Sequence, residues 1–352
     1  MIEPRIDPSA DALVTTVIPT YRRPALLKRA IESVLGQTAG TQRIAVYDNA
    51  SGDDTGAVVL DIARRDPRVR YHRQAANLGP FENFRFGLAE VSTPFFSLLS
   101  DDDVLLPRFY ETALSALREH PTALFAVTRV LQVDRTGHLL SIEGRSWSPG
   151  LHGPPDSVRE MLRLGYVTWT GTLFRREVIQ RTGGFDSQTA AAFDLDFLLR
   201  LAARCPFVIC DRVGGVYMAE TSVVALEASL IAWEKIIDNI SIEPRLSTSE
   251  RAQAQQALRQ QLAGLVYRIG RAAARQGKVP EARSAARVLR ERFAETRRAR
   301  LIEATAVVCR RVRVVPALLA LLLQGYRDVR SSGLRGRLDA GDRRFLETME
   351  PG

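Results

Sequence analysis

The sequence predicts an α/β protein in which a mostly parallel sheet is flanked by helices and followed by an α-helical C-terminal region. Over the first 225 residues, short apolar runs alternate with stretches of helical period. Such strand–helix–strand alternation is typical of a parallel sheet with helices on both faces. From about residue 226, strand signals become sparse, and helical sequence rich in Arg, Ala, Gln and Leu continues to about residue 329.

The expected strands are short and apolar. We predict strands over 13–19, 43–49, 69–74, 95–100 and 123–133. Pro24 begins a helix after the first strand, because proline is tolerated in a first helical turn. The apolar face of that helix is expected to consist of Leu27, Ala30, Ile31 and Val34. The segment 135–171 is rich in Gly, Pro, Ser and Trp, and we expect it to loop over the carboxyl edge of the sheet.

The composition is that of a globular protein that needs no cross-links. Hydrophobic residues make up 45% of the 352 residues and charged residues 25%, which excludes collagen-like and wholly disordered classes. The three cysteines form no CxxC pair, so neither a zinc ribbon nor a disulfide framework is expected. The first 14 residues lack the apolar core of a signal peptide, and we expect a cytoplasmic location.

The net charge of +9 is unevenly distributed along the chain. Residues 1–225 carry −1, whereas residues 226–352 carry +10. Together with the change in sequence pattern, this asymmetry predicts an N-terminal tail over 1–11, a catalytic domain over 12–225 and a basic helical region over 226–352.

Three adjacent aspartates, Asp101, Asp102 and Asp103, directly follow an apolar strand. Neighbouring carboxylates raise one another's pKa unless a cation neutralises them, and carboxylate oxygens suit Mg²⁺ or Mn²⁺. The alternative is an acidic cap on a helix beginning near Pro107. Ligands of parallel sheets bind beyond the carboxyl ends of the strands, so this cluster is expected beside Thr20 and Asp48, which end two other strands.

Five sequence blocks follow one another in a fixed order. They read VIPTYRRPALLKRAIESVLGQT, AVYDNASGDDT, NLGPFENFRFGL, LLSDDDVLLP and GGFDSQTAAAFDLDFLLRLA. In this order they resemble the family 2 glycosyltransferases of the GT-A fold, over roughly residues 12–218. The resemblance implies a GT-A type sheet and an inverting, metal-dependent transfer from a nucleotide sugar; the C-terminal third lies outside it.

The resemblance also implies roles for residues at the strand ends. The residues expected to bind the nucleotide are Thr20, Tyr21, Asp48, Asn77 and Asp101. Asp48 matches the carboxylate that contacts the base, and Asp101 and Asp102 match the DXD motif, with Asp102 favoured as the metal ligand and Asp103 as a second one. Ser100 stands where the usual pattern has its first Asp, which leaves open which of the three aspartates holds the ion.

Asp194 matches the family's general base, six residues before Arg200. The family's usual Glu-Asp pair reads Phe193-Asp194 here. Asp196 is a chemical rival, but it lies on another face of the helix. Trp169 and Gly171 are expected on the acceptor side, with buried packing of the Trp as an equal alternative.

The expected function is therefore transfer of a sugar from a UDP- or dTDP-sugar to a hydroxyl of a glycan or lipid-linked acceptor, with Mn²⁺ or Mg²⁺, in surface-polysaccharide or cell-envelope synthesis. A sugar-nucleotide nucleotidyltransferase is an alternative, but it needs a Gly-rich basic loop where PTYRRP stands. A basic nucleic-acid-binding protein is another. No nucleic acid is expected, because the arginines alternate with long aliphatic rather than aromatic residues.

The C-terminal region contains the apolar run VVPALLALLL at 314–323, flanked by five arginines. Its ten residues are too few to cross a bilayer, which takes about 20. We expect residues from about 300 onward to lie on an anionic membrane surface without spanning it. The alternative is that this run packs as an ordinary helix against the catalytic domain, beside 262–270.

Overall fold

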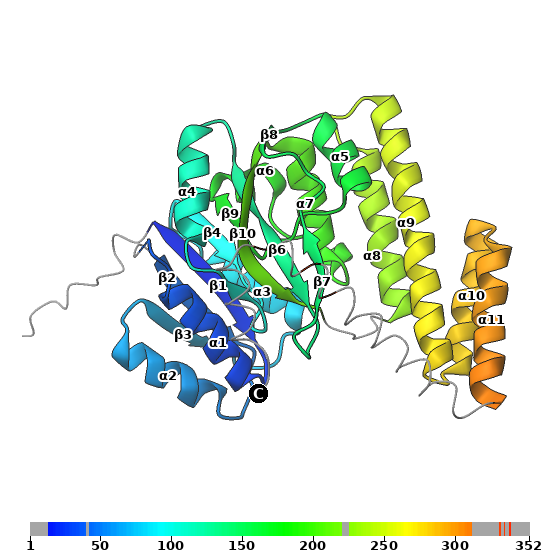
Figure 1. Ribbon diagram of the computed structural model, residues 1–352, viewed down its shortest axis with the longest axis horizontal. Helices are drawn as coiled ribbons and strands as arrows, with labels where there is room; N and C mark the ends of the chain where they lie inside the picture. Colours follow the sequence, from blue (N-terminus) through cyan, green and yellow to red (C-terminus); the bar gives the residue numbers. More distant parts are fainter. Residues whose placement is uncertain are drawn as a thin grey trace, which may run out of the picture.

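The structure, a computed structural model, describes residues 13–39, 42–219 and 225–311, together with Ser331, Leu334 and Leu338. A ten-stranded sheet forms the centre, with helices packed against it and a group of longer helices at its side (Figure 1). The predicted α/β class with a helical C-terminal region is confirmed.

The strands are β1 (Val14–Thr20), β2 (Gln42–Asp48), β3 (Val69–Arg73), β4 (Phe95–Leu98), β5 (Val104–Leu105), β6 (Phe125–Val133), β7 (Leu139–Glu143), β8 (Gly150–His152), β9 (Thr172–Arg175) and β10 (Phe207–Met218). The helices are α1 (Pro24–Leu35), α2 (Thr55–Arg65), α3 (Pro80–Ala89), α4 (Phe109–Glu119), α5 (Asp156–Leu164), α6 (Glu177–Thr182), α7 (Phe193–Arg204), α8 (Leu226–Ser241), α9 (Thr248–Arg275), α10 (Val279–Phe293) and α11 (Thr296–Arg311). A short 3₁₀ helix, η1, covers Ser187–Thr189.

The sheet order is β3-β2-β1-β4-β9-β6-β10-β5, with β7 beside β6 and β8 beside β10. The first four strands are parallel, as predicted, and β6 and β10 are parallel to each other. Strand β9 is antiparallel to both neighbours, β4 and β6. The prediction of a loop over 135–171 was wrong, because this segment contains β7, β8 and α5. These elements are short and β7 is only partly buried, so its sequence lacks a strong apolar run.

Both faces of the sheet are covered by apolar clusters. On β1, Val14 and Ile18 belong to the cluster under α1, α2 and α4, whereas Val17 belongs to the cluster under α3 and α7. The four residues predicted for the inner face of α1 are all completely buried. Helix α3 approaches β1 closely at Gly87, where an added Cβ would lie 2.5 Å from Val17 Cγ1.

The C-terminal helices share a core with the sheet-bearing part. Helices α8 and α9 lie beside α5 and α7, and α10 and α11 lie farther from the sheet (Figure 1). The cluster that contains Phe174 of β9 and Phe197 of α7 continues through Trp233 and Val266 to Ile302. Helix α9 begins at a capping box between Ser247 and Glu250 and includes the apolar stretch 262–270.

Three residues near the C-terminus pack against the sheet. Ser331 Oγ accepts a hydrogen bond from the backbone N–H of Leu139, at 2.9 Å. Leu334 and Leu338 are buried in a cluster with residues of β5, β6, β7 and β10. These three residues pack against the fold, whereas the run 314–323, to which the packing alternative refers, lies outside the described residues. In the described part of the chain, no helix is long and apolar enough to span a membrane.

Candidate active site

A pocket of about 610 Å³ opens at the carboxyl ends of β1 and β4. Five residues that the sequence predicts for nucleotide or metal binding line it, namely Thr20, Tyr21, Asn77, Asp101 and Asp102. Parallel pairing of the two strands brings Thr20 to the acidic loop, although 81 residues separate it from Asp101. The arrangement matches the expected position of a ligand in a parallel sheet.

Thr20, Arg23 and the first two aspartates form one polar cluster on the pocket wall. Thr20 Oγ1 donates a hydrogen bond to Asp101 Oδ2 at 2.7 Å. Arg23 Nη1 bridges the carboxylates, at 3.2 Å from Asp101 Oδ1 and 3.0 Å from Asp102 Oδ2. Burial raises the pKa of Asp101 to about 6, although Thr20 and Arg23 both act in the opposite direction. The sequence analysis did not select Arg23. The available signal was its position three residues after Thr20, at the end of a strand expected beside the acidic loop.

Asp103 faces away from the pocket. It is 1% exposed, and its Oδ1 accepts the backbone N–H of Met218 at 2.9 Å. Its Oδ2 accepts the hydroxyl of Thr170. Burial and the nearby Asp102 raise its pKa to about 8. These contacts tie the acidic loop to β10 and to the segment before β9, so Asp103 is a structural anchor here rather than a metal ligand.

The residues present fit a divalent ion held by two carboxylates. Asp101 and Asp102 both line the pocket, and Mg²⁺ commonly takes one or two protein carboxylates, completing its shell with water and substrate phosphates. A larger all-protein cage is absent, since the described residues contain no group of three or more His, Cys, Asp or Glu placed to hold a metal. Asp101 and Asp102 therefore suit a divalent ion that binds together with a phosphorylated ligand.

Asp48 lies behind the pocket wall instead of on it. It is 2% exposed, and its two oxygens accept hydrogen bonds from Ser51 N–H at 2.9 Å and Tyr71 Oη at 2.6 Å. Its neighbour Asn49 lines the pocket instead, donating through Nδ2 to Asn77 Oδ1 at 2.9 Å. The prediction that Asp48 contacts the ligand is not matched by this geometry, and Asn49 is the polar side chain that sequence analysis overlooked.

Asp194 lies in the first turn of α7 and is not among the residues that line the pocket. Its side chain is exposed, and the surrounding protein still displaces enough water to raise the pKa of its carboxyl. The preceding Phe193 packs its ring 5.6 Å from that of Phe84, which lines the pocket. Asp196 is buried on the other side of the helix, as predicted, in an ion pair with Arg200.

The two residues expected on the acceptor side are packed into the fold. The ring of Trp169 lies 4.8 Å from Phe84 and 5.4 Å from Phe193, within an aromatic cluster. Gly171 has a φ of +73°, and an added Cβ would lie 2.7 Å from both Thr128 and Val130. Gly171 therefore has a structural reason to be glycine, and Trp169 packs between Phe84, which lines the pocket, and Phe193 of α7.

Comparison with known proteins identifies the sheet-bearing part. A family model described as Glycosyl transferase family 2 matches residues 15–183. This segment belongs to glycosyl transferase family 2. The match favours glycosyl transfer for this segment over the nucleotidyltransferase and nucleic-acid-binding alternatives.

Relatives of this glycosyltransferase include characterised and uncharacterised proteins. An uncharacterized protein of Mycobacterium tuberculosis is 28% identical over 261 residues, covering 70% of this chain and 81% of the relative. A chondroitin synthase of Escherichia coli is 28% identical over 57% of this chain. The GalNAc(5)-diNAcBac-PP-undecaprenol beta-1,3-glucosyltransferase of Campylobacter jejuni is 35% identical over 30% of this chain. The matches span only 28% and 35% of these two enzymes.

Solved structures show the same fold. Residues 1–349 of S. aureus TarS superimpose with a TM-score of 0.60 at 13% identity, covering 83% of this chain and 90% of that one. The complex of this TarS fragment with UDP-GlcNAc gives a TM-score of 0.61 at 14% identity. At such identities the likeness establishes the architecture of the glycosyltransferase and not its substrates.

Proposed function

We propose that this protein is an inverting glycosyltransferase that moves a sugar from a UDP- or dTDP-sugar to a hydroxyl of a glycan or lipid-linked acceptor, in the synthesis of a surface polysaccharide or another cell-envelope glycan. The observation that carries the proposal is the pocket at the ends of β1 and β4, where Thr20, Asp101 and Asp102 meet. The TarS complexes with UDP-GlcNAc and UDP support a uridine nucleotide as its occupant.

The donor's nucleoside is held by the β1 and β2 ends of the pocket in this proposal. Asn49 and Asn77, joined by their amides, offer polar groups to the nucleoside. Tyr21, 38% exposed, offers an aromatic face for stacking. Asp48 supports this wall from behind through Ser51 and Tyr71 and makes no direct contact.

Asp102, with Asp101, would hold Mn²⁺ or Mg²⁺ in the donor complex. Such an ion neutralises the charge that develops on the departing diphosphate. Arg23 is within reach of both carboxylates. The guanidinium would add positive charge on the leaving-group side of the pocket, where it could donate hydrogen bonds to the diphosphate.

Asp194 is the proposed general base. Its exposed carboxylate accepts the proton of the acceptor hydroxyl as that oxygen attacks the anomeric carbon from the side opposite the diphosphate. A single base and one in-line displacement give inversion. The raised pKa of Asp194 suits this role, because a stronger base accepts the hydroxyl proton more readily.

The helical region after residue 225 is proposed to bring the enzyme to its acceptor at a membrane surface. The Campylobacter relative acts, by its name, on an undecaprenol-linked glycan, which supports a lipid-linked acceptor. On α11, Leu301, Val307 and Val308 are exposed. Exposed Arg297 and Arg300 lie on the same helix, and cationic residues near apolar ones favour an anionic lipid surface.

Calorimetry with UDP and dTDP, in the presence and absence of Mn²⁺, tests the donor half of the proposal. We expect metal-enhanced binding of one nucleotide. An assay of UDP or dTDP release from a panel of nucleotide sugars then tests the reaction class. Absence of binding to either nucleotide with Mn²⁺ or Mg²⁺ present would overturn the proposal.

A further inference from the structure

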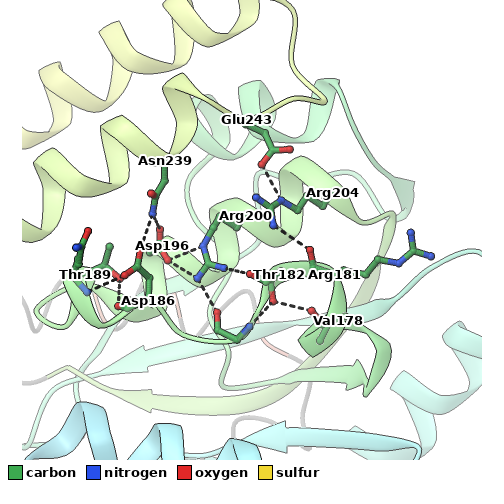
Figure 2. Close-up of polar contacts among 12 residues, drawn as sticks. Val178, Arg181, Thr182, Asp186, Thr189, Asp196, Arg200, Arg204, Asn239 and Glu243 are labelled. Atoms are coloured by element: carbon green, nitrogen blue, oxygen red, sulfur yellow. Dashed lines mark hydrogen bonds and ion pairs between the residues drawn. The ribbon is translucent and has the colours of Figure 1, made fainter.

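A buried ion pair between Asp196 and Arg200 fixes the inner face of α7 (Figure 2). Asp196 and Arg200, one helical turn apart, are 1% and 7% exposed. Arg200 donates through Nε and Nη2 to Asp196 Oδ2, at 2.8 and 2.5 Å. It also donates to the carbonyl oxygens of Thr182 and Gly184, at 2.6 and 2.9 Å. The guanidinium therefore fastens α7 to the end of α6.

Asn239 of α8 completes this cluster from outside α7. Its Nδ2 donates to Asp196 Oδ1 at 2.9 Å and to Asp186 Oδ2 at 3.2 Å (Figure 2). Ionised carboxylates only accept hydrogen bonds, so the amide must turn its NH₂ group toward them, and both of its hydrogens are used. Asn239, a residue of the C-terminal helical region, is thus hydrogen-bonded to the carboxylates of Asp186, which precedes η1, and Asp196 of α7.

The second of these carboxylates shapes the turn that precedes α7. Asp186 Oδ1 accepts the backbone N–H of Gln188 at 2.9 Å and so caps η1. The carbonyl oxygen of Asp186 accepts the hydroxyl of Thr189 at 2.8 Å. Asn239 is therefore bonded both to this turn and to the first helical turn that follows it.

The placement of Asp194 depends on that first helical turn. Asp194 precedes Asp196 by two residues, which separates the side chains by about 200° around the helix axis. Asp196 points inward and Asp194 outward. The N-cap residue of α7, Ala192, makes no side-chain capping bond, so the inner anchor at Asp196 fixes the start of the helix.

We propose that Asn239 is a positioning residue, which sets the place and orientation of Asp194 through Asp196 and Asp186. The C-terminal helical region then helps to build the acceptor side of the active site. The proposal rests on the proposed function in one respect, the role of Asp194 as base.

A second tie between the same helices provides a matched control. Glu243, just beyond α8 and 1% exposed, accepts a hydrogen bond from Arg204 Nε at 2.8 Å. Arg204 is the last residue of α7, at the end opposite to Asp194. Glu243→Gln removes the charge of this ion pair, although the amide oxygen can still accept from Arg204, and so weakens the packing of α8 on α7 without touching the first turn of α7.

The experiment compares Asn239→Leu with Glu243→Gln in the full chain. Leu removes both donors while it keeps the branched shape of Asn. We measure the melting temperature, UDP affinity by calorimetry with Mn²⁺, and the rate of UDP release from UDP-GlcNAc and UDP-glucose with water as acceptor. We expect Asn239→Leu to lower kcat by about 10- to 100-fold with UDP affinity unchanged, because small displacements of a catalytic group are costly. Glu243→Gln is expected to lower the melting temperature and leave kcat unchanged.

Hydrogen exchange gives a readout that does not need activity. Peptides covering 186–198 should exchange faster in Asn239→Leu than in the wild type, and not in Glu243→Gln. If the wild type binds neither UDP nor dTDP, the proposed function fails. In that case, or if the wild type releases no UDP from these two donors, exchange alone decides: unchanged exchange over 186–198 overturns the positioning role, and faster exchange there supports it.

For an active wild type, an unchanged kcat in Asn239→Leu, or an equal loss in Glu243→Gln, overturns the proposal. If Asn239→Leu does not fold, Asn239→Gln replaces it, since it keeps the amide but moves it by one methylene. A lower kcat at unchanged UDP affinity supports the positioning role, and an unchanged kcat contradicts it.

Discussion

Thr20 and Asp101 are joined by a 2.7 Å hydrogen bond from Oγ1 to Oδ2, across the ends of two neighbouring parallel strands. The bond links the loop after β1 to the acidic loop after β4, so the two walls of the pocket are held as one unit. Asp101 also accepts from Arg23, which in turn reaches Asp102. The acidic loop is thus held at the pocket before any ligand arrives.

Asp102→Ala should abolish the enhancement of nucleotide binding by Mn²⁺. The proposed ion would lose its main carboxylate, while the polar groups around the nucleoside remain. Calorimetric titration of UDP with and without Mn²⁺ measures the effect. Asp61→Ala, which removes an exposed carboxylate of α2, is the control and should behave as the wild type. Equal metal enhancement in Asp102→Ala and wild type would contradict the metal assignment.

Asp194→Asn should reduce transfer by about 10²–10⁴-fold while nucleotide binding persists, because Asn keeps the shape of Asp but cannot accept the proton. The release of UDP from the active donor and the affinity for UDP are measured on the same preparation. A variant with near-normal turnover would show that another group is the base. Asp186 and Asp196 are acids close to it in sequence, but both are bonded to Asn239.

The pH dependence of kcat/KM should report the raised pKa of Asp194. A base works only when deprotonated, so activity should fall as the pH drops through this pKa. Since desolvation raises the pKa, the acid limb should lie above 3.8, the ordinary value for Asp. A profile measured on the wild type, and again on Asp194→Glu to see whether the limb moves, checks this. An acid limb at or below the ordinary value would exclude Asp194 as the titrating base.

Much of the parallel half of the fold could be predicted, because β1, β2 and β4 are buried apolar runs that end in polar residues at a common edge. The roles of individual aspartates at that edge could not. Asp48 and Asp103 resemble pocket residues in sequence, yet their oxygens accept hydrogen bonds from Tyr71 and Met218. These partners are 23 and 115 residues away, and no local pattern indicates them.

The link between Asn239 and α7 was equally invisible in the sequence. Asn239 lies in a helix with an ordinary amphipathic pattern, outside the segment that matches the family model. Its significance depends on the packing of α8 against η1 and α7, which brings one amide between two carboxylates. The Asp196–Arg200 pair, in contrast, is spaced one helical turn apart, which is a spacing that favours an ion pair on a helix.

Gly171→Ala should lower the free energy of unfolding by about 2–6 kcal/mol, since steric overlap and an unfavourable positive φ each cost roughly 1–3 kcal/mol. The added methyl would meet Thr128 and Val130 at 2.7 Å. Gly52→Ala is the matched control, because Gly52 has a similar φ of +67° and no atom within 4 Å of the added Cβ. The difference between the two variants in urea unfolding isolates the overlap. Equal losses would show that Gly171 is required for its backbone conformation alone.

The full chain should float with anionic vesicles at low salt and be released as the salt concentration rises. Each Arg near an anionic surface contributes about 1 kcal/mol, and salt screens this attraction. Leu301 and Val308, 54% and 47% exposed on α11, lie seven residues apart and so share one helix face. Replacing both by Ser should weaken flotation, whereas Leu60→Ser on α2, a residue 50% exposed, should not. Flotation that is absent at low salt, or equal with neutral vesicles, would show that the arginines of this region serve another purpose. In that case the C-terminal segment would serve to stabilise the fold. Because Leu334 and Leu338 are buried, truncation after residue 311 should then lower the melting temperature of the sheet-bearing part.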